Sequence, residues 1–366
     1  MQRGLFDRRL LQNFDWPLLA AAATLVALGT ISLWSLSIAS GGTGGLAWRQ
    51  LWWVGVGTLA LLVVVSVDYR TLVRLSPAFY VVGLGLLITV FVLGRTVSGA
   101  RRWIHLGPIT VQPSELFKVI FVLVLTWMFT GRWMRAPSRG TLAWAIALTA
   151  VPFLLVVKQP DLGTALTLLP VLAAILLGVG VRLSILGRLA GAVLAATPLA
   201  WFVMKEYQRE RLLVYLDPFR DPLGTAYNVI QAKIAIGSGQ LLGRGVSGAT
   251  QSRLAFLPER HTDFIFAVFA EMWGFLGCLV LIGAYGLLVL RGYEIAAAAP
   301  EARGRLIALG VTTLFAVQAL INLGMVTGLL PIVGIPLPFM SYGGSSMVVS
   351  LMALGLLLSV RMRQFG

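Results

Sequence analysis

The chain has 366 residues, of which 58% are hydrophobic and 12% charged, and its formal net charge at pH 7 is +15. Soluble domains carry roughly 25% charged residues, so this composition excludes a soluble fold and indicates a chain whose apolar side chains face lipid. The basic residues are spread through the loops between apolar runs. They form no cluster on one soluble face, which argues against nucleic acid as a partner.

Ten apolar stretches are long enough to cross a bilayer, which takes about 20 residues with a range of about 17–25. The sequence therefore predicts an all-α polytopic membrane protein, with residues 1–366 forming a single integral membrane domain. The segment from Met1 to Asp15 is polar and basic, so we expect no cleavable signal peptide. The ten stretches are Trp16–Ser37, Leu51–Val67, Pro77–Leu93, Ser114–Thr130, Thr141–Val157, Leu162–Gly180, Ile185–Met204, Asp263–Leu290, Leu306–Gly328 and Ser341–Val360.

The fifth and sixth stretches are separated only by the tetrapeptide from Lys158 to Asp161. A charged segment that contains a proline is costly in mid-bilayer, so we divide the two stretches there. The distribution of Lys and Arg tests the count, because short cytoplasmic loops carry the excess of these residues. With both termini in the cytoplasm, the inner segments hold fifteen such residues and the short outer loops five.

One connection, from Lys205 to Thr262, is far longer than the others and lies outside on this topology. Loops longer than about 12–15 residues are usually functional or disordered. Apolar residues recur at helical spacing in Tyr227–Ile236, and glycines punctuate the segment that follows. We therefore expect residues 205–262 to form a structured extracytoplasmic loop with short helices.

Ionisable residues at membrane depth are costly, so each is a candidate functional residue. Four acids lie at or within the edges of predicted spans, namely Glu115, Asp161, Asp263 and Glu271. The first three lie at outer ends, and Glu271 lies about two turns deeper. The four could therefore share one outward-facing cavity.

Asp263 ends the long loop and begins an apolar stretch, and two interpretations stay open. It could cap or charge-stabilise the first turn of a helix, which is worth about 0.5–2 kcal/mol. It could instead act as a general base at the boundary between water and membrane. Position alone does not choose between them.

Two further groups lie before or within the fourth predicted span. Glu115 and Lys118 are three residues apart and share one helix face. They form either a charge-neutralising ion pair or a phosphate site in which Glu115 holds Lys118. Arg101, Arg102 and Trp103 precede the same helix. They form either an interfacial belt of basic and aromatic residues or a clamp for pyrophosphate, which suits the arginine fork.

The two histidines, His105 and His261, are isolated, and no pair of residues has the spacing of a structural zinc site. We therefore expect no structural metal. No Gly-x-Ser-x-Gly motif and no phosphate-binding P-loop occurs, which argues against a serine hydrolase or an ATPase. The single cysteine, Cys278, excludes an intrachain disulfide.

Several short motifs stand out along the chain, and the most specific is the run Pro-Glu-Arg-His-Thr-Asp-Phe from Pro258 to Phe264. The stretches that contain them are Gly99–Gly107, Gln112–Lys118, Gln159–Thr164, the segment from Tyr207 to Gly239, Leu257–Ala267 and Pro338–Ser345, which together extend over most of the chain. In their order and spacing these stretches resemble the SEDS family (shape, elongation, division and sporulation), most closely its elongation member.

The resemblance implies ten transmembrane helices in the inner membrane of a bacterium, with the large outer loop between the seventh and eighth. It also implies an inverting glycosyltransferase that polymerises lipid II, with a class B penicillin-binding protein, a transpeptidase, as partner. By residue match, Asp263 is the family's essential aspartate. Trp103, Glu115, Lys118 and Asp161 fall on other motif positions. Ala255 departs from the pattern, since members often carry an acid there, and this puts the regulation of activity in doubt.

The implied reaction needs a base for the acceptor hydroxyl of lipid II and cations for the leaving diphosphate. We assign Asp263 as the catalytic base, because a partly dry cavity raises a carboxyl pKa towards a useful range. The candidate diphosphate ligands are Arg101, Arg102, Lys118 and Lys158, together with a divalent cation (Mg or Mn) retained by acidic residues. The full set of candidate substrate-binding residues is Arg101, Arg102, Trp103, Glu115, Lys118, Lys158, Asp161, His261 and Glu271.

Two other functions stay open, a lipid II flippase and a non-catalytic scaffold of the elongation machinery. A flippase needs polar residues across both leaflets, whereas the acids here gather in the outer half and favour an enzyme. Membrane lipids surround the chain in every case. Small residues at Gly283, Gly286 and Gly310 allow close helix approach, so we expect the partner's single transmembrane helix on the lipid-facing side of the eighth and ninth spans.

Overall fold

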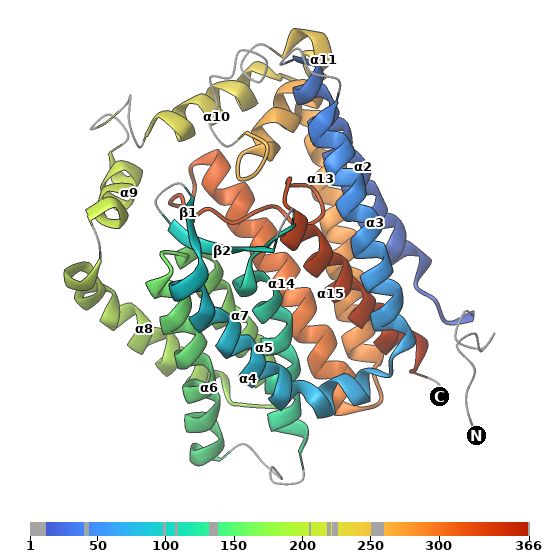
Figure 1. Cartoon of the computed structure of the whole chain (residues 1–366), viewed down its shortest axis with the longest axis vertical. Coiled ribbons are helices and arrows are strands. Elements are labelled where there is room, and N and C mark those ends of the chain that lie inside the picture. Colours follow the sequence, from blue (N-terminus) through green and yellow to red (C-terminus); the bar gives the residue numbers. More distant parts are fainter. Residues whose placement is uncertain are drawn as a thin grey trace.

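The computed structural model describes residues 12–39, 44–97, 100–106, 109–131, 138–204, 206–217, 221, 226–249 and 260–364. A helix occurs at each of the ten apolar stretches, and eight of these helices are long and apolar enough to cross a membrane. The chain is therefore a polytopic membrane protein (Figure 1). The ten helices are α2 (Trp16–Ala39), α3 (Gly45–Ser66), α4 (Tyr69–Leu93), α5 (Pro113–Thr130), α6 (Arg139–Lys158), α7 (Leu162–Gly178), α8 (Leu183–Val203), α13 (Ile265–Ala298), α14 (Ala302–Thr327) and α15 (Gly344–Met362).

The helices differ strongly in how much of each is buried, so the bundle has central helices and peripheral helices. In α5 and α15, 78% of the most apolar stretch is buried inside the protein, against 22% in α3 and α6. The centre is filled by side chains such as Phe117 and Phe121 of α5 and Leu354 of α15. Polar side chains on the central helices are therefore shielded from lipid and can be held in place by neighbouring helices.

Helix α4 begins eight residues before the predicted Pro77, at Tyr69. The side chain of Asp68 accepts a hydrogen bond from the backbone N–H of Arg70 at 2.8 Å and so caps the first turn. Pro77 lies inside the helix. The cap therefore sets the start of this helix, and the apolar count alone placed it too late.

A small antiparallel sheet lies between α4 and α5, and the all-α expectation missed it. Its strands are β1 (Arg95–Val97), β2 (Ala100–Leu106) and β3 (Ile109–Val111), in the order β1-β2-β3. Trp103 pairs with Arg95, and Ile104 pairs with Val111. Strands this short carry too little alternation to be recognised from sequence. The sheet fixes Arg101, Arg102 and Trp103 on a rigid element.

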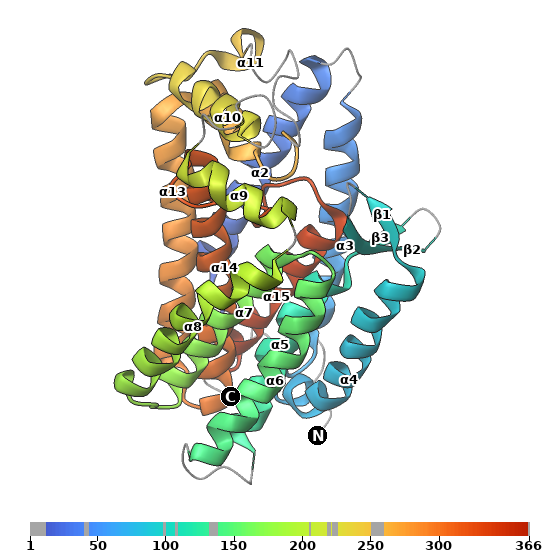
Figure 2. The same cartoon turned by 90° about the vertical axis from the view of Figure 1, so that its left-hand side faces the viewer.

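The long connection contains α9 (Glu206–Leu216), α10 (Tyr227–Ser238) and the short α11 (Gly245–Gly248). The helix predicted over Tyr227–Ile236 is present as α10. Figures 1 and 2 show α10 and α11 at the end of the bundle opposite the last turns of α15. The connection therefore forms a structured cap on one end of the bundle.

Part of this connection is bonded into α13, which is broken at Gly274 (φ 62°, ψ −162°). Beyond the break, the backbone N–H groups of Phe275 and Leu276 donate to the carbonyls of Gln240 and Leu241 at 2.8 and 3.1 Å. A Cβ on Gly274 would lie 2.3 Å from the backbone nitrogen of Gly243. Glycine is therefore required for the loop to reach the helix this closely.

Candidate functional site

Asp161 is the centre of a buried polar cluster at the start of α7. Its side chain is 1% exposed and accepts hydrogen bonds from Gln112 Nε2 and Ser114 Oγ, each at 3.0 Å. It also accepts from the backbone N–H of Thr164 at 3.4 Å as the N-cap of α7. Nη1 of Arg102 lies 3.7 Å from Oδ1 of Asp161. Residues from the sheet, α5 and α7 are thus held on one carboxylate.

Arg102 is the cation of this cluster that remains partly accessible, with 22% of its side chain exposed. Its Nη2 donates to the carbonyl of Pro160. Its Nε is buried and has no hydrogen-bond partner among the described residues. An anionic ligand could therefore reach Arg102 through the exposed part of its side chain. On the same strand, Arg101 is exposed and Trp103 is half-buried.

Glu115 and Lys118 form a buried ion pair in the first turns of α5, with Oε1 and Nζ 2.8 Å apart. The two side chains are only 3% and 2% exposed. Pro113 occupies the first turn of α5, where its missing N–H costs no hydrogen bond. The pairing expected from the three-residue spacing is therefore present, and one more cation is placed one turn from the Asp161 cluster.

Asp263 lies in a turn before α13, which begins at Ile265 with Phe264 as its N-cap residue. The N-cap position belongs to Phe264, and Asp263 directly precedes it, so an acid that stabilises the first turn and a general base both stay open as interpretations. Burial lowers the pKa of Arg260 in the same turn, although an arginine stays charged at neutral pH. A cation thus lies three residues from Asp263 along the chain.

Asn322 of α14 and Gly334 hold the turn from the other side. Asn322 is fully buried, and its Nδ2 donates to the carbonyls of Asp263 at 2.9 Å and Ile335 at 2.7 Å. Gly334 has a φ of 68°, and a Cβ placed on it would lie 3.3 Å from Oδ2 of Asp263. The Asp263 carboxylate therefore lies against the backbone of the segment that joins α14 to α15.

The segment 331–345, which includes the first two residues of α15 and which we call the α14–α15 connection, contacts both groups of candidate residues. At one side, Ser341 Oγ donates to the carbonyl of Thr262 at 2.7 Å. The backbone N–H of Tyr342 donates to the carbonyl of His261 at 2.8 Å. The rings of His261 and Tyr342 have centroids 5.7 Å apart. At the other side, Ser345 Oγ accepts from the backbone N–H of Gln112 at 3.0 Å.

Helix α7 packs on the same connection beside Asp161. A Cβ on Gly163 would lie 2.6 Å from the carbonyl oxygen of Val333, so only glycine permits this approach. Val333 and Ile335 flank Gly334, which lies against Asp263. Asp161 and Asp263 are therefore on two sides of one short run of backbone, although 102 residues separate them in the chain.

Other predicted residues are placed differently. Lys158, at the end of α6, has an exposed side chain. Glu271 is fully buried in α13, and its carbonyl accepts from the backbone N–H of Arg244 at 2.9 Å. Gly310 was predicted on the lipid-facing side, and this is wrong. A Cβ there would lie 2.7 Å from Val122 of α5, so Gly310 faces the centre of the bundle.

Sequence reasoning missed the neutral polar residues that organise the site, notably Gln112, Ser114, Asn322 and Ser345. The signal for Asn322 was available, because a side-chain amide within a membrane-spanning helix is costly unless it is hydrogen-bonded. Gln112 and Ser114 lie within the motif Gln112–Lys118, whose charged positions carry the stronger sequence signal. Gln112 and Ser114 act by hydrogen-bonding to Asp161, and only the fold brings Asp161 near them.

The fold and this site define a polytopic membrane protein in which carboxylates and cations from distant parts of the chain are gathered around one connection. The chain matches the FtsW/RodA/SpoVE family of cell cycle proteins over residues 15–365. It belongs to this family, which is the SEDS family that its motifs resemble.

Proteins related over nearly their full length carry the same family relationship. Peptidoglycan glycosyltransferase MrdB of Escherichia coli K12 is 39% identical over 349 residues, covering 95% of this chain and 93% of that protein. Stage V sporulation protein E of Bacillus subtilis is 36% identical over 324 residues, covering 85% and 86%.

Solved structures are similar as well. The rod shape determining protein RodA of Thermus thermophilus has a TM-score of 0.71 and 31% identity, covering 96% of this chain and 98% of that one. A chain in a peptidoglycan synthase complex, described as coordinating polymerization and crosslinking, has a TM-score of 0.79 and 36% identity, covering 96% and 98%.

Proposed function

We propose that this protein is a peptidoglycan glycosyltransferase that polymerises lipid II into β-1,4-linked glycan strands and releases undecaprenyl pyrophosphate. Relatives named as peptidoglycan glycosyltransferases match it over nearly the whole chain. The observation that carries the proposal at the level of the site is the meeting of Asp263 and the Asp161 cluster on the α14–α15 connection. This arrangement offers a carboxylate base and cations within one region.

In the proposed reaction, the 4-hydroxyl of the acceptor sugar attacks the anomeric carbon of the growing strand. The new carbon–oxygen bond forms on the face opposite the pyrophosphate, so the configuration inverts. The bond from the anomeric carbon to the pyrophosphate oxygen breaks, and the hydroxyl proton passes to Asp263. A positioned base of this kind contributes typically about 10²–10⁴-fold to the rate.

The leaving diphosphate gains negative charge as this bond breaks, so cations near it stabilise the transition state. Arg102 is the strongest candidate, because its guanidinium is partly exposed and its Nε has no partner among the described residues. Lys118 supplies a second positive charge, held by Glu115. Arg101 and Lys158 are exposed and suit a role in capturing the substrate. Trp103, His261 and Glu271 complete the proposed set of substrate-binding residues.

A divalent cation, Mg or Mn, is proposed to accompany the diphosphate. In the described part of the chain, no three His, Cys, Asp or Glu side chains converge on one point. The protein residues described therefore do not form a complete cage for a metal. Magnesium is commonly bound by one or two carboxylates together with substrate phosphates, and the acids of the site fit that mode. Such a cation would offset charge on the diphosphate.

We place the protein in the inner membrane of a bacterium with ten spans, both termini in the cytoplasm and residues 205–262 outside. The distribution of fifteen inner against five outer basic residues supports this orientation. Helix α10 belongs to the connection that we place outside, and it lies at the same end of the bundle as the turn before α13 (Figure 2). This supports a site that faces outward. Lipid II displayed on the outer leaflet would then reach Asp263.

A class B penicillin-binding protein is the proposed partner. The related complex described as coordinating polymerization and crosslinking supports a partner with crosslinking activity. Helix α13 presents an exposed apolar face that includes Phe275, Leu279 and Ile282. Gly283 and Gly286 lie on this helix with open space where a Cβ would be. We propose that the partner's transmembrane helix packs there, without Gly310.

The deciding experiment is polymerisation of purified lipid II by the purified full chain, with and without the partner. Glycan strands that form with this chain, and not with its Asp263→Asn variant, would support the enzyme. Movement of lipid II across vesicle membranes without any glycan product would instead identify a flippase. If neither glycan product nor movement of lipid II is detected in the presence of the partner, the result would support a non-catalytic scaffold.

A further inference from the structure

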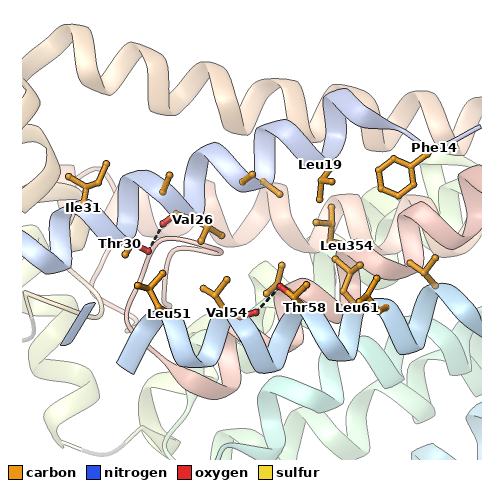
Figure 3. Close-up of a pocket in the computed structure, with 16 residues that line it drawn as sticks. Phe14, Leu19, Val26, Thr30, Ile31, Leu51, Val54, Thr58, Leu61 and Leu354 are labelled. Carbon is orange, nitrogen blue, oxygen red and sulfur yellow. Dashed lines mark hydrogen bonds between the residues drawn. The ribbon is translucent and has the colours of Figure 1, made fainter. Parts of the chain in front are cut away.

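An apolar groove of about 560 Å³ runs between α2 and α3, with α15 as its floor (Figure 3). Its walls include Ala23, Ala27 and Ile31 of α2 and Val54 and Leu62 of α3. Leu351 and Leu354 of α15 close its base. Helices α2 and α3 lie side by side (Figure 1). The alanines on α2 keep the space between them open, because their side chains are too short to fill it.

The groove offers no hydrogen bond to an occupant. The two hydroxyl residues in its lining, Thr30 and Thr58, each donate to a carbonyl of their own helix at 2.8 Å. Among the residues that the structure describes, no charged side chain lines the groove. An occupant must therefore be hydrocarbon along its whole buried length, because an unpaired polar group there would be costly.

The dimensions fit a single hydrocarbon chain rather than a helix. From Phe14 to Ile31 the groove follows α2 for about 25 Å, whereas one leaflet is about 15 Å of the ~30 Å hydrocarbon core, so an acyl chain anchored at one mouth fits within the groove. A helix of about 10 Å diameter could insert only one ridge of its side chains between α2 and α3, whereas one hydrocarbon chain can lie along the whole groove. A partner's transmembrane helix or a second copy of this chain is therefore a poor fit.

One mouth of the groove is basic. Arg361 follows Leu354 on α15 by seven residues and so lies on the same face as the groove floor. Its Nε is 3.8 Å from Oδ2 of Asp15, which Arg291 already holds at 2.7 Å. Two guanidinium groups thus share this buried carboxylate beside Phe14. Glu294 pairs with Arg291 from the exposed side.

Arg363 adds a further cation at this mouth. Its Nη2 donates to the carbonyl of Val65, a residue that lines the groove, at 2.8 Å. Burial lowers the pKa of this guanidinium, yet an arginine stays charged at neutral pH. The apolar groove therefore opens onto positive charge at the end of the bundle where α15 finishes.

We propose that the groove binds an anionic glycerophospholipid, with one acyl chain between α2 and α3 and its phosphate at Arg361 and Arg363. Basic pockets between membrane helices on the cytoplasmic side recognise anionic headgroups in this way. The site is distinct from the substrate site, since Arg361 and Ser345 lie at opposite ends of α15, about 24 Å apart. A lipid in this groove ties α2 and α3 to α15, whose first turn bonds to Gln112.

The test is native mass spectrometry of the full chain in detergent, titrated with equal amounts of phosphatidylglycerol and phosphatidylethanolamine. We expect phosphatidylglycerol to be retained at least about fivefold more strongly, because each arginine beside an anionic headgroup contributes about that factor. Ala27→Phe and, separately, Ala23→Phe fill the groove and should lower retention more than about tenfold. Arg361→Gln should lower the preference for phosphatidylglycerol about fivefold while lipid is still bound, because Arg363 remains.

The matched controls are Ala147→Phe on the exposed face of α6 and Arg188→Gln on α8, both outside the groove. Each should leave lipid retention unchanged, and thermal unfolding of all variants verifies folding. Unchanged retention in both groove-filling variants would overturn the site. Equal retention of the two lipids by the unaltered chain would overturn the anionic headgroup. A dimer or a bound protein that Ala27→Phe displaces would show another occupant and overturn the proposal.

Discussion

The side-chain amide of Asn322 donates to the main-chain carbonyl of Asp263 at 2.9 Å and thereby ties the turn before α13 to the middle of the fold. The same nitrogen donates to the carbonyl of Ile335 at 2.7 Å. One buried side chain thus fixes the position of Asp263 relative to the α14–α15 connection.

Asn322→Leu removes this donor from two carbonyls, and we expect a destabilisation of about 1–3 kcal/mol. The polymerisation rate should fall further, by about 10²-fold, because a small displacement of a catalytic group is enough for such a loss. The measurements are polymerisation of lipid II and thermal unfolding on the same sample. Thr327→Val is the control, since that hydroxyl bonds only within α14. A normal rate in a stably folded Asn322→Leu protein would remove Asn322 from the site.

Asp263→Asn directly tests the proposal that Asp263 is the catalytic base. Asn cannot accept the proton, so the rate should fall by about 10²–10⁴-fold while the protein stays folded. Asp263→Glu keeps the carboxylate and moves it by one methylene, so it should be impaired less. Asp68→Asn is the matched control, because Asp68 caps α4 and Asn caps a helix about as well. Polymer formation close to normal in Asp263→Asn would send the search for a base to Glu115, Asp161 or Glu271.

Breaking the buried pair of Glu115 and Lys118 by a single substitution should cost roughly 3–5 kcal/mol, because it leaves one charge unpaired. Lys118→Met and Glu115→Met should therefore each unfold at lower temperature. The double variant removes both charges and should recover most of the stability. Its activity should stay low if Lys118 also acts on the diphosphate. A double variant with full activity would restrict the pair to a structural role.

Gly274→Ala should disrupt the contact between the long connection and α13. The backbone conformation at Gly274 is open to glycine alone, and strain of this kind costs about 1–3 kcal/mol. The added methyl would also meet Gly243. We expect a lower unfolding temperature and faster proteolysis near residue 240. Gly286→Ala on the same helix has open space and should be neutral. Equal behaviour of the two variants would mean that the docked loop adds no stability.

The proposed orientation in the membrane predicts which positions a membrane-impermeant thiol reagent reaches. With Cys278 replaced by alanine, a cysteine at Ser247 should be labelled from outside intact cells. Cysteines at Arg135 and at the C-terminus should react only after the cells are opened. Arg135 and the last two residues lie outside the described part of the chain, so labelling supplies information that the fold does not. Labelling at Arg135 in intact cells would reverse the topology.

Length and apolarity were enough to place the helices, because a bilayer requires a nearly fixed number of apolar residues for each span. For α7 the predicted start at Leu162 is the one found, and for α5 it differs by one residue. Asp161, Asp263 and Arg102 also stood out, since charges near a membrane span are rare and costly. The capped start of α4 and the short sheet were missed because local hydrogen bonds, rather than apolarity, determine them.

The sequence by itself thus determined a polytopic membrane protein of the SEDS family and most of the charged candidates at its site. Only the tertiary structure decided that Asn322 holds Asp263, that Gln112 and Ser114 hold Asp161, and that Gly310 points inward. The physical reason is that lipid and protein core are both apolar, so an apolar helix carries little information about which face meets its neighbours. Partners for buried polar groups must then come from helices far away in the chain, and their identity depends on how the bundle packs.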